Sequence, residues 1–276
     1  MNSAEMSPAL NRVMADPGGT LLALDFDGTL AHIVDDPARA FGHAAALDAV
    51  ARLASVLGQI AIVTGRPVWQ AVELGGLVAR SGLERLIVCG QYGAERWTPA
   101  DGPPPHSTVL APVERVLDAL PGWLAEHDAR AARIEPKGLA VAVHTRGLAP
   151  GTRDRLFAPL AVLATEYGLV AELGREVIEL RSDGWDKGRV IELLASEFSV
   201  RNIVFAGDDL GDLPAYDAVD RLRSNGMNGY LICSGSDEQS ALAQRADVVV
   251  PGPDGVAGWL SQLADAFGLD QGRSST

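Results

Sequence analysis

The chain has 276 residues, of which 47% are hydrophobic, and its formal net charge at pH 7 is −13. This length suffices for one large domain or for two smaller ones, each with a buried core. The acidic balance, with no run of Lys and Arg interleaved with aromatic residues, excludes nucleic acid as an expected partner.

The first part of the chain alternates strands and helices. After a short opening helix, three apolar runs, GGTLLALDF, QIAIVTG and RLIVCG, predict buried strands, because continuous apolar runs of this length suit a parallel sheet. Helical periodicity predicts helices over residues 43–57 and 67–80 between them. Alternation of this kind is typical of an open parallel sheet with helices on both faces.

A cluster of prolines within residues 99–108 ends this pattern, because proline suits neither a helix interior nor a central strand. We place a domain boundary there. Two units follow, each made of a helix and a β-hairpin. The helices span 112–127 and 150–167, and the hairpins turn near Lys137 and Gly174. This order predicts a small α+β module.

The alternation of helix and strand resumes with DGWDKGRVIELL and NIVFAGDD and continues to a last helix near residues 255–267, followed by a frayed tail over 270–276. The predicted architecture is α/β, a Rossmann-like parallel-sheet core domain with a smaller α+β domain inserted into it. We assign residues 1–107 and 183–276 to the core domain and residues 108–182 to the insert.

Acidic residues stand where predicted strands end: Asp25 and Asp27 after the first strand, Asp208 and Asp209 after a later one. Ligands of open parallel sheets bind at this end of the strands. Like charges about 4 Å apart repel by roughly 4 kcal/mol at an effective dielectric constant near 20, so such a cluster needs a cation. Oxygen ligands without His or Cys select Mg²⁺. A single Asp of this set is more simply a helix cap or a turn residue.

Two further polar residues occupy comparable positions, Thr64 after the second strand and Lys187 at the start of a helix. Alone, Thr64 is explained as a helix cap and Lys187 as a surface lysine. A lysine at a helix N-terminus is nevertheless unfavourable for the helix dipole, which favours a bound anion beside it. Phosphoryl oxygens held by a hydroxyl, an ammonium group and Mg²⁺ would supply that anion.

Four motifs in chain order resemble those of the haloacid dehalogenase superfamily of phosphatases: DFDGTL, IVTGR, DGWDKGRVIELL and FAGDDLGD. Longer stretches are similar to the trehalose-6-phosphate phosphatases: GQYGAERW, EPKGLAVAVHTR, GREVIELRSDGWDKG and AGDDLGDLPAYDAV. The resemblance covers nearly the whole chain. It implies Mg²⁺-dependent hydrolysis of trehalose 6-phosphate to trehalose and phosphate through a phospho-aspartyl intermediate, the last step of trehalose biosynthesis.

The resemblance also implies a role for each matching residue. Asp25 would be the nucleophile that attacks phosphorus. Asp27 would protonate the leaving sugar oxygen and then take a proton from the attacking water. Thr64 and Lys187 would hold the phosphoryl oxygens.

The same resemblance implies the ligands of the metal ion. Mg²⁺ would bind a side-chain oxygen of Asp25, the backbone carbonyl of Asp27 and the side chain of Asp208. Asp209 and Asp212 would lie around the ion without being its main ligands. For Asp212, the alternative of orienting the lysine or a metal-bound water is left open.

The resemblance makes the inserted domain a cap that excludes water and recognises the sugar. Along its strands, apolar residues such as Val141 and Ile178 alternate with polar or small ones, and we expect the polar face to look at the active site. The candidate sugar-binding residues are Lys137, His144, Arg146 and Glu179 in the cap, Glu135 as a weaker one, and Gln91, Tyr92 and Glu95 in the core. Gln91 stands where many relatives have His or Asn. Any one of these side chains is otherwise explained as solvated surface.

Three other functions are weighed against this one. A phosphatase of the same superfamily for another sugar phosphate, such as sucrose 6-phosphate, would keep the chemistry and change the cap. A receiver domain of a response regulator also uses an acidic magnesium pocket, but it lacks an acid two residues beyond its phosphorylated Asp, so Asp27 argues against it. A non-catalytic sugar-phosphate-binding module is disfavoured because every group needed for turnover is present.

The expected partner is a small-molecule sugar phosphate, and the sequence is compatible with a monomer. Cys89 and Cys233 each close an apolar run and are interpreted as buried thiols of a cytoplasmic protein. The sequence does not open with a basic segment followed by an apolar one, and no run of about 18 apolar residues occurs. We therefore expect neither export nor a membrane span.

Overall fold

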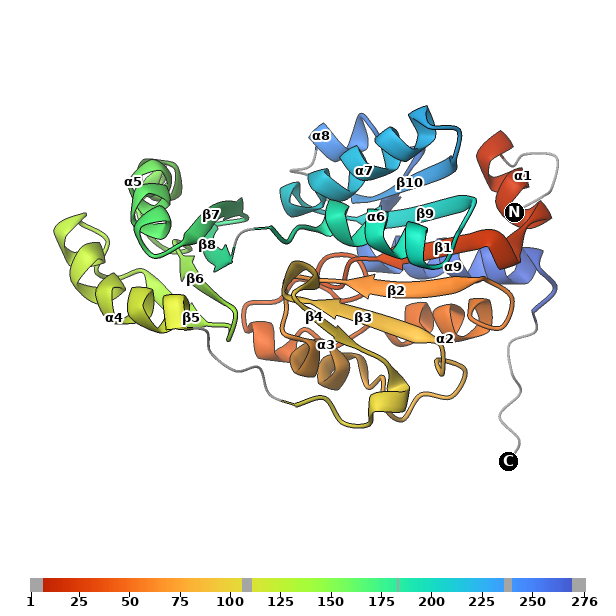
Figure 1. Cartoon of the computed structure of the whole chain (residues 1–276), viewed down its shortest axis with the longest axis horizontal. Helices are drawn as coiled ribbons and strands as arrows, with labels where there is room; N and C mark the ends of the chain where they lie inside the picture. Colours follow the sequence, from red (N-terminus) through yellow and green to blue (C-terminus); the bar gives the residue numbers. More distant parts are fainter. Residues whose placement is uncertain (1–6, 106–110, 183, 236–239, 270–276) are drawn as a thin grey trace. The chain divides into compact units, whose positions relative to one another are not determined.

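The structure, a computed structural model, describes residues 7–105, 111–182, 184–235 and 240–269. The chain divides into two compact units, one made of Met1–Pro104 and Asp186–Thr276 and the other of Pro105–Trp185. The second unit, called here the inserted unit, interrupts the first, called the core unit (Figure 1). The predicted boundary at 107/108 and the predicted tail lie outside the described residues. The other predicted boundary, after residue 182, precedes the observed division after Trp185.

The core unit contains a seven-stranded sheet in the order β11-β10-β9-β1-β2-β3-β4. Neighbouring strands are parallel, except that β4 runs antiparallel to β3. The strands are β1 (Thr20–Leu24), β2 (Gln59–Val63), β3 (Leu86–Gly90), β4 (Glu95–Trp97), β9 (Asn202–Gly207), β10 (Asn228–Gly235) and β11 (Val248–Pro251). The predicted parallel sheet is confirmed. The sequence did not predict β4, because three residues are too few to show an alternating pattern.

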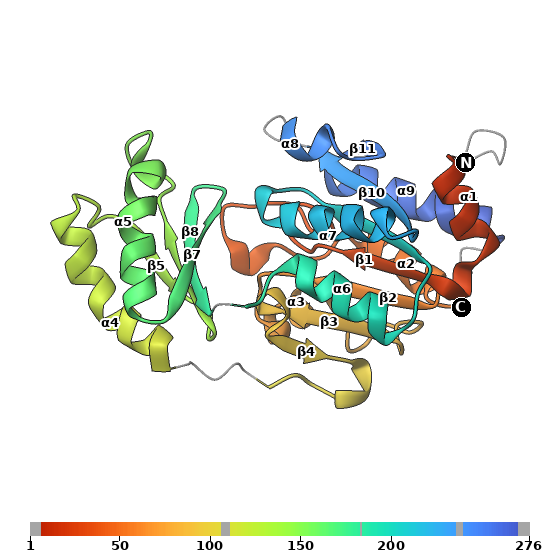
Figure 2. The same ribbon diagram turned by 45° about the horizontal axis from the view of Figure 1, so that its top comes forward.

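Helices cover both faces of this sheet, as predicted (Figures 1 and 2). The helices that pack on one face are α1 (Pro8–Ala15), α2 (Ala44–Leu53), α3 (Val68–Gly75) and α9 (Gly252–Ala266). Those on the other face are α6 (Lys187–Glu197), α7 (Leu213–Ser224) and the short α8 (Ser240–Ala243).

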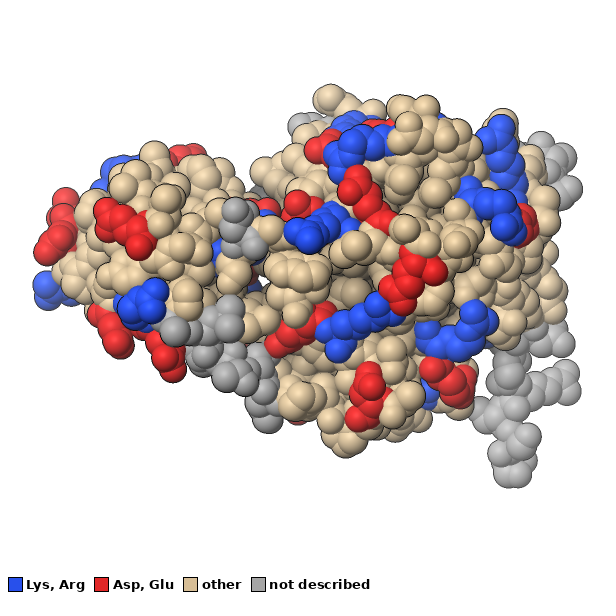
Figure 3. Space-filling model, viewed as in Figure 1, with Lys and Arg blue, Asp and Glu red and all other residues tan. Residues whose placement is uncertain are grey.

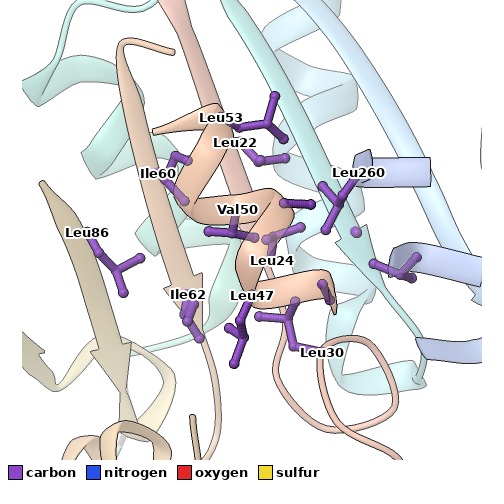
Figure 4. Close-up of a cluster of buried hydrophobic side chains, with 14 of the residues drawn as sticks. Leu22, Leu24, Leu30, Leu47, Val50, Leu53, Ile60, Ile62, Leu86 and Leu260 are labelled. Carbon is purple, nitrogen blue, oxygen red and sulfur yellow. The ribbon is translucent and has the colours of Figure 1, made fainter. Parts of the chain in front are cut away.

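Alternate residues of the central strands fill two separate hydrophobic clusters. Leu22 and Leu24 of β1 pack with α2 and α9, where Figure 4 shows Val50 and Leu260 beside them. Leu21 belongs to the cluster on the opposite face. Complete burial of a leucine side chain contributes about 1.5–3 kcal/mol. These clusters therefore fix the register of the strands, and with it the positions of the residues that follow their ends.

Capping groups set the helix ends near those strand tips. Asp186 Oδ1 accepts a hydrogen bond from the backbone N–H of Arg189 at 2.7 Å, so α6 begins at Lys187. Helix α3 ends at Gly75 and is capped by Gly76, whose φ of 58° is in the left-handed region that glycine tolerates. Helix α9 begins at Gly252 rather than near residue 255, because proline in the first turn of a helix is favourable.

The inserted unit is a four-stranded antiparallel sheet packed on two helices. Its strand order is β5-β6-β8-β7, and its elements are α4 (Ala111–Glu126), β5 (Arg133–Pro136), β6 (Ala140–His144), α5 (Thr152–Glu166), β7 (Leu169–Gly174) and β8 (Val177–Ser182). Val141, Val143, Ile178 and Leu180 are buried in one cluster with residues of both helices. The predicted α+β module with one apolar sheet face is therefore confirmed.

Charged side chains of both signs are interspersed on the face of the molecule that Figure 3 shows. Arg221 and Glu192 pair at 2.7 Å, and Arg96 and Glu197 pair at 2.7 Å, all on exposed positions. Among the described residues, no helix is both long enough and apolar enough to cross a membrane.

Candidate active site

The predicted site residues Asp25 and Asp208 directly follow the two adjacent parallel strands β1 and β9. Leu24 pairs in register with Ala206, and the backbone N–H of Asp25 donates a hydrogen bond to the carbonyl of Ala206 at 2.9 Å. Asp25 and Asp208 therefore leave the sheet at the same edge. Because both strands end there, two acids far apart in the sequence come together.

Three carboxylates form a buried cluster at this edge. Oxygen atoms of Asp25, Asp208 and Asp212 all lie within 4.8 Å of one another, and the exposed fractions of these residues are 4%, 5% and 0%. Asp212 comes from the turn between β9 and α7, where Leu210–Asp212 forms one turn of 3-10 helix. An unpaired carboxylate is costly to bury, so the cluster requires positive charge close by.

Lys187, the first residue of α6, supplies part of that charge. Its Nζ lies 2.7 Å from Asp25 Oδ1 and 2.7 Å from Asp212 Oδ1, and the residue is 4% exposed. Burial lowers the pKa of Lys187, but the carboxylates of Asp212 and Asp25 outweigh burial and hold the pKa well above its usual value. Lys187 is therefore a fixed ammonium group between the two acids.

Asp212 also fixes the loop that carries Asp208. While one oxygen contacts Lys187, the other accepts hydrogen bonds from the backbone N–H of Asp208 at 2.8 Å and of Asp209 at 3.1 Å. The Asp209 side chain caps the same turn, since its Oδ1 accepts from Gly211 N at 2.8 Å. The sequence left open whether Asp212 lies around the metal ion or orients the lysine or a metal-bound water. Its contact with Lys187 is the one expected of a residue that orients the lysine.

Gly28 brings the loop after β1 against Asp208. Its φ is +74°, and a Cβ built on it would stand 2.0 Å from Asp208 Oδ2. Only glycine permits both the backbone conformation and this close approach. The carbonyl of Gly28 also accepts a hydrogen bond from Ser234 Oγ of β10 at 2.5 Å. The glycine of the DFDGTL motif therefore allows the loop after β1 to pack directly against Asp208.

The carboxylate cluster carries more negative charge than Lys187 alone offsets. Burial raises the pKa of Asp25, against the lowering effect of Lys187. Burial raises the pKa of Asp208 as well, with further contributions from Asp209 and Asp25. A divalent cation would hold both groups ionised. The donors are carboxylate oxygens without His or Cys, which is the chemistry that suits Mg²⁺, so the residues fit the predicted ion.

Asp27, two residues beyond Asp25, has a partner that the sequence did not reveal. Arg66 Nε donates to Asp27 Oδ2 at 2.6 Å, and Arg66 Nη2 donates to Asp27 Oδ1 at 2.7 Å. The Arg66 side chain is 8% exposed and the Asp27 side chain 37%. Arginine forms such paired hydrogen bonds with a carboxylate in one fixed orientation. Asp27 is therefore held in place by a residue of the IVTGR motif.

The predicted residue Thr64 follows β2 in a turn that pairs with the Gln91–Tyr92 segment. Thr64 Oγ1 accepts from Arg66 N at 3.1 Å, Tyr92 N donates to Thr64 O at 3.0 Å, and Gln91 N donates to Arg66 O at 2.9 Å. Gln91 and Tyr92 have φ values of 49° and 58°, which non-glycine residues seldom adopt. A Cβ on Gly65 would stand 2.8 Å from the Tyr92 hydroxyl, so the two turns are tightly packed together.

Glu95, a predicted sugar-binding residue, caps a helix in the structure. Its Oε2 accepts a hydrogen bond from the backbone N–H of Val68, the first residue of α3, at 2.6 Å. The residue before α3 is Pro67, whose side chain makes no capping bond. Glu95 thus supplies the acceptor that this helix start lacks, an arrangement that the favourable dipole interaction reinforces.

On the inserted unit, most of the predicted sugar-binding residues lie on the sheet face away from the helices. Lys137 Nζ forms an ion pair with Glu179, and His144 Nε2 lies 2.6 Å from Glu135 Oε2. The hydrogen bond from His144 lowers the pKa of Glu135 to about 2. Arg146 lies apart, beside the turn between β7 and β8, where its Nε contacts Glu176 Oε2 at 3.1 Å.

The same polar face holds two residues that the sequence reading did not single out. Glu172 of β7 stands directly opposite Glu179 of β8, and Arg181 Nε donates to Glu172 Oε2 at 2.6 Å. Glu135 and Glu179 both pair in register with Ala142, on opposite sides of β6. Three glutamates therefore form a row across the sheet. Arg181 alternates with Leu180 along β8, which is the pattern that predicts it on the face of Glu179, but it was not among the sugar-binding candidates.

Comparisons with known proteins give relatives in sequence and in fold. The chain is 33% identical over 248 residues to a trehalose-phosphate phosphatase of Mycobacterium marinum, a match that covers 87% of this chain and 60% of that protein. The chain therefore spans about three-fifths of the length of this curated relative. The structure of the C-terminal domain of a C. albicans trehalose-6-phosphate phosphatase is similar with a TM-score of 0.71 and 21% identity, covering 94% of this chain and 96% of that one.

A haloacid dehalogenase-like hydrolase from Bacteroides thetaiotaomicron shares the fold with a TM-score of 0.60 and 15% identity, covering 88% of this chain and 99% of that one. These structural similarities agree with the predicted α/β core and inserted cap. The profile of the family described as trehalose-phosphatase matches residues 23–250. Because this match spans most of the sequence and includes every acid of the site, the chain belongs to the trehalose-phosphatase family.

Proposed function

We propose that this chain hydrolyses trehalose 6-phosphate to trehalose and phosphate, with Asp25 as the nucleophile. The observation that carries the proposal is the contact of Asp25 with Lys187 at 2.7 Å inside a cluster of buried carboxylates. This arrangement offers a carboxylate oxygen beside a fixed ammonium group, as phosphoryl transfer to an aspartate requires. Membership of the trehalose-phosphatase family, and the relatives named for that activity, point to the substrate.

The reaction would proceed in two displacements. An Asp25 oxygen attacks phosphorus while the bond from phosphorus to the sugar oxygen breaks, and Asp27 gives its proton to that oxygen. Water then attacks phosphorus of the aspartyl phosphate, Asp27 takes a proton from this water, and the Asp25 carboxylate is released with free phosphate. The Asp27 carboxylate is positioned for both transfers by its two hydrogen bonds from Arg66.

Asp25, Asp208 and the backbone carbonyl of Asp27 would hold Mg²⁺, with Asp209 and Asp212 in supporting positions. When bound, the ion supplies positive charge that neutralises the buried carboxylates and the phosphoryl oxygens. Lys187, and the hydroxyl and backbone of Thr64, would hold phosphoryl oxygens. The contacts of Asp212 with Lys187 and with the loop at Asp208 give it the role of fixing these groups.

We propose that the inserted unit acts as the cap that recognises the sugar. Its polar sheet face carries acceptors and donors in close pairs, Lys137 with Glu179 and His144 with Glu135. Hydroxyl groups of a disaccharide can exchange for such partners without leaving a buried charge unpaired. Arg146 and, from the core unit, Gln91 and Tyr92 are further candidates, whereas the contact of Glu95 with helix α3 supports a structural role for it. The buried free thiols Cys89 and Cys233 suit the cytoplasm, where we place this activity.

The test is a panel of phosphorylated sugars assayed for released phosphate, with and without Mg²⁺, on the wild-type chain and on Asp25→Asn. We expect Mg²⁺-dependent release from trehalose 6-phosphate and none from the variant. Preferred release from sucrose 6-phosphate would favour the second phosphatase function instead. Binding of trehalose 6-phosphate without turnover in the wild type would favour a non-catalytic sugar-phosphate-binding module.

A further inference from the structure

A second group of potential metal ligands lies in the core unit apart from the acidic cluster. It consists of His32, His43 and Asp254, whose ligand atoms all lie within 4.8 Å of one another. His43 Nε2 is 2.9 Å from Asp254 Oδ1, and His32 Nε2 is 3.4 Å from the same oxygen. The side chains are 53% exposed for His32, 23% for His43 and 74% for Asp254, so an ion can reach them from solvent.

These three residues come from separate segments. His32 lies in the loop after β1, His43 immediately precedes α2, and Asp254 lies in the first turn of α9. Helices α2 and α9 pack in the same hydrophobic cluster, which holds two of the three ligands at a fixed separation. The imidazole rings of His32 and His43 have their centroids 5.9 Å apart. The group is therefore assembled by the fold and not by spacing along one helix.

We propose that His32, His43 and Asp254 bind a transition metal ion with the ligand preferences of Zn²⁺. Two imidazole nitrogens and one carboxylate oxygen form a ligand set typical of zinc sites with one position left for water. In a tetrahedral site with bonds of about 2.0–2.1 Å, neighbouring ligand atoms are about 3.3 Å apart. The observed separations of 2.9 and 3.4 Å require only small side-chain shifts to match.

Metal binding would replace an existing hydrogen-bond arrangement at His43. Its Nδ1 accepts from the backbone N–H of Ala46 at 3.3 Å, so in the metal-free form the proton of the neutral ring sits on Nε2 and is shared with Asp254. An ion on Nε2 displaces that proton, and the ring must then carry its proton on Nδ1. The backbone N–H of Ala46, in the first turn of α2, then loses His43 Nδ1 as its acceptor and can hydrogen-bond only with water. Metal binding at His43 is therefore expected to switch the neutral ring from the Nε2–H to the Nδ1–H tautomer.

Metal binding at this location would affect the stability of the core unit. His43 N donates to the Leu30 carbonyl at 2.6 Å, and Gly28 N donates to the Ala31 carbonyl at 2.7 Å. An ion bound by His32 and His43 would cross-link the loop that begins at Asp25 to the ends of α2 and α9. The expected effect is a higher thermal stability of the core unit, because the ion binds only the folded arrangement.

The experiment measures Zn²⁺ binding to the full chain by calorimetry in excess Mg²⁺, which competes for the acidic cluster. We expect one Zn²⁺ per chain, and a dissociation constant raised at least about tenfold by each of His32→Ala, His43→Asn and Asp254→Asn. Asn at position 43 can still cap the helix, so this variant removes the ligand without removing the cap. Asp208→Asn should leave this Zn²⁺ affinity unchanged.

His127→Gln is the matched control, because His127 is on the inserted unit, where its ring stacks on Trp123. Equal Zn²⁺ affinity in wild type and His32→Ala would overturn the proposal, as would the absence of Zn²⁺ binding at micromolar concentration. Loss of binding in Asp208→Asn, but not in His32→Ala, would place the ion at the acidic cluster. A melting temperature that Zn²⁺ raises in wild type and not in His32→Ala would support the cross-link.

Discussion

Arg66 donates two hydrogen bonds to Asp27, from Nε to Oδ2 at 2.6 Å and from Nη2 to Oδ1 at 2.7 Å. A carboxyl group that takes up a proton can accept freely at only one oxygen, so one of these bonds must weaken whenever Asp27 is protonated. In the proposed mechanism Asp27 gains and loses a proton in every cycle. In that mechanism Arg66 would be a positioning residue that holds the orientation of the Asp27 side chain while its charge changes.

We predict that Arg66→Lys lowers kcat for trehalose 6-phosphate by about 10- to 100-fold with little change in KM, because lysine offers one charge without the paired geometry. Steady-state kinetics would measure both values, and circular dichroism would show that the variant is folded. An unchanged kcat would mean that the orientation of Asp27 does not depend on Arg66.

Asp212→Asn should reduce stability as well as activity. Asn has one acceptor oxygen where Asp212 has two, so either Lys187 or the backbone N–H groups of Asp208 and Asp209 lose their acceptor in a fully buried position, at a cost of about 1–3 kcal/mol. Urea unfolding would measure this loss in the core unit. Asp217→Asn is the control, because Asp217 makes its ion pair with Arg245 at an exposed position, where the loss should be less than about 1 kcal/mol. Equal losses in both variants would contradict a special role for Asp212.

Gly28→Ala should abolish phosphate release, because the new methyl group would occupy the position of the Asp208 carboxylate. Gly226→Ala separates this clash from backbone strain. Gly226 has a φ of +90°, but a Cβ there would meet no atom within 4 Å, so only the cost of the left-handed conformation, about 1 kcal/mol, applies. Phosphate release by Gly28→Ala at the level of Gly226→Ala would show that Asp208 can move without consequence.

The parallel sheet and the meeting of acids at its edge could be predicted because strand ends are visible as apolar runs that stop at polar residues. Asp25 and Asp208 follow such runs directly. The partner of Asp27 could not be predicted in the same way. Arg66 lies 39 positions away along the chain, and no periodicity links the two residues. Only the packing of the turn after β2 against the loop after β1 determines that contact.

The role of Glu95 shows a second limit. A glutamate near a strand end looks the same in sequence whether it binds a ligand or caps a helix. Here α3 begins after Pro67 without a side-chain cap of its own, and Glu95 approaches it from the short strand β4, which the pattern did not predict. The missed strand and the different contact of Glu95 therefore have one cause, the antiparallel return of the chain beside β3.

Glu135 provides a prediction for pH dependence. The hydrogen bond from His144 Nε2 lowers the pKa of Glu135 from its usual 4.5 to about 2. Because the folded pKa lies below the unfolded one, this pair stabilises the protein above pH 4.5, and the contribution, at most about 3 kcal/mol, is lost as pH falls through about 2. Carbon NMR of the Glu135 carboxyl would follow the titration. In His144→Gln the midpoint should move up toward 4.5, and an unmoved midpoint would exclude His144 as the cause.

Glu179 offers the sharpest test of sugar recognition by the inserted unit. Its carboxylate pairs with Lys137 on the polar face of the sheet, in register with Ala142 and Glu172. If sugar hydroxyls bind there, Glu179→Ala should lower kcat/KM for trehalose 6-phosphate by at least about tenfold. Hydrolysis of p-nitrophenyl phosphate, which has no sugar, should fall much less.

Glu166→Ala is the matched control, because Glu166 is exposed at the end of α5, away from the polar sheet face. It should leave hydrolysis of both substrates unchanged. Equal losses on both substrates in Glu179→Ala would mean that the residue supports the structure of the inserted unit or the chemical step, because a group that contacts only the sugar cannot affect a substrate without one. A selective loss on trehalose 6-phosphate separates substrate recognition from phosphoryl transfer. It would also assign recognition to the inserted sheet and transfer to the acids at the tips of β1 and β9.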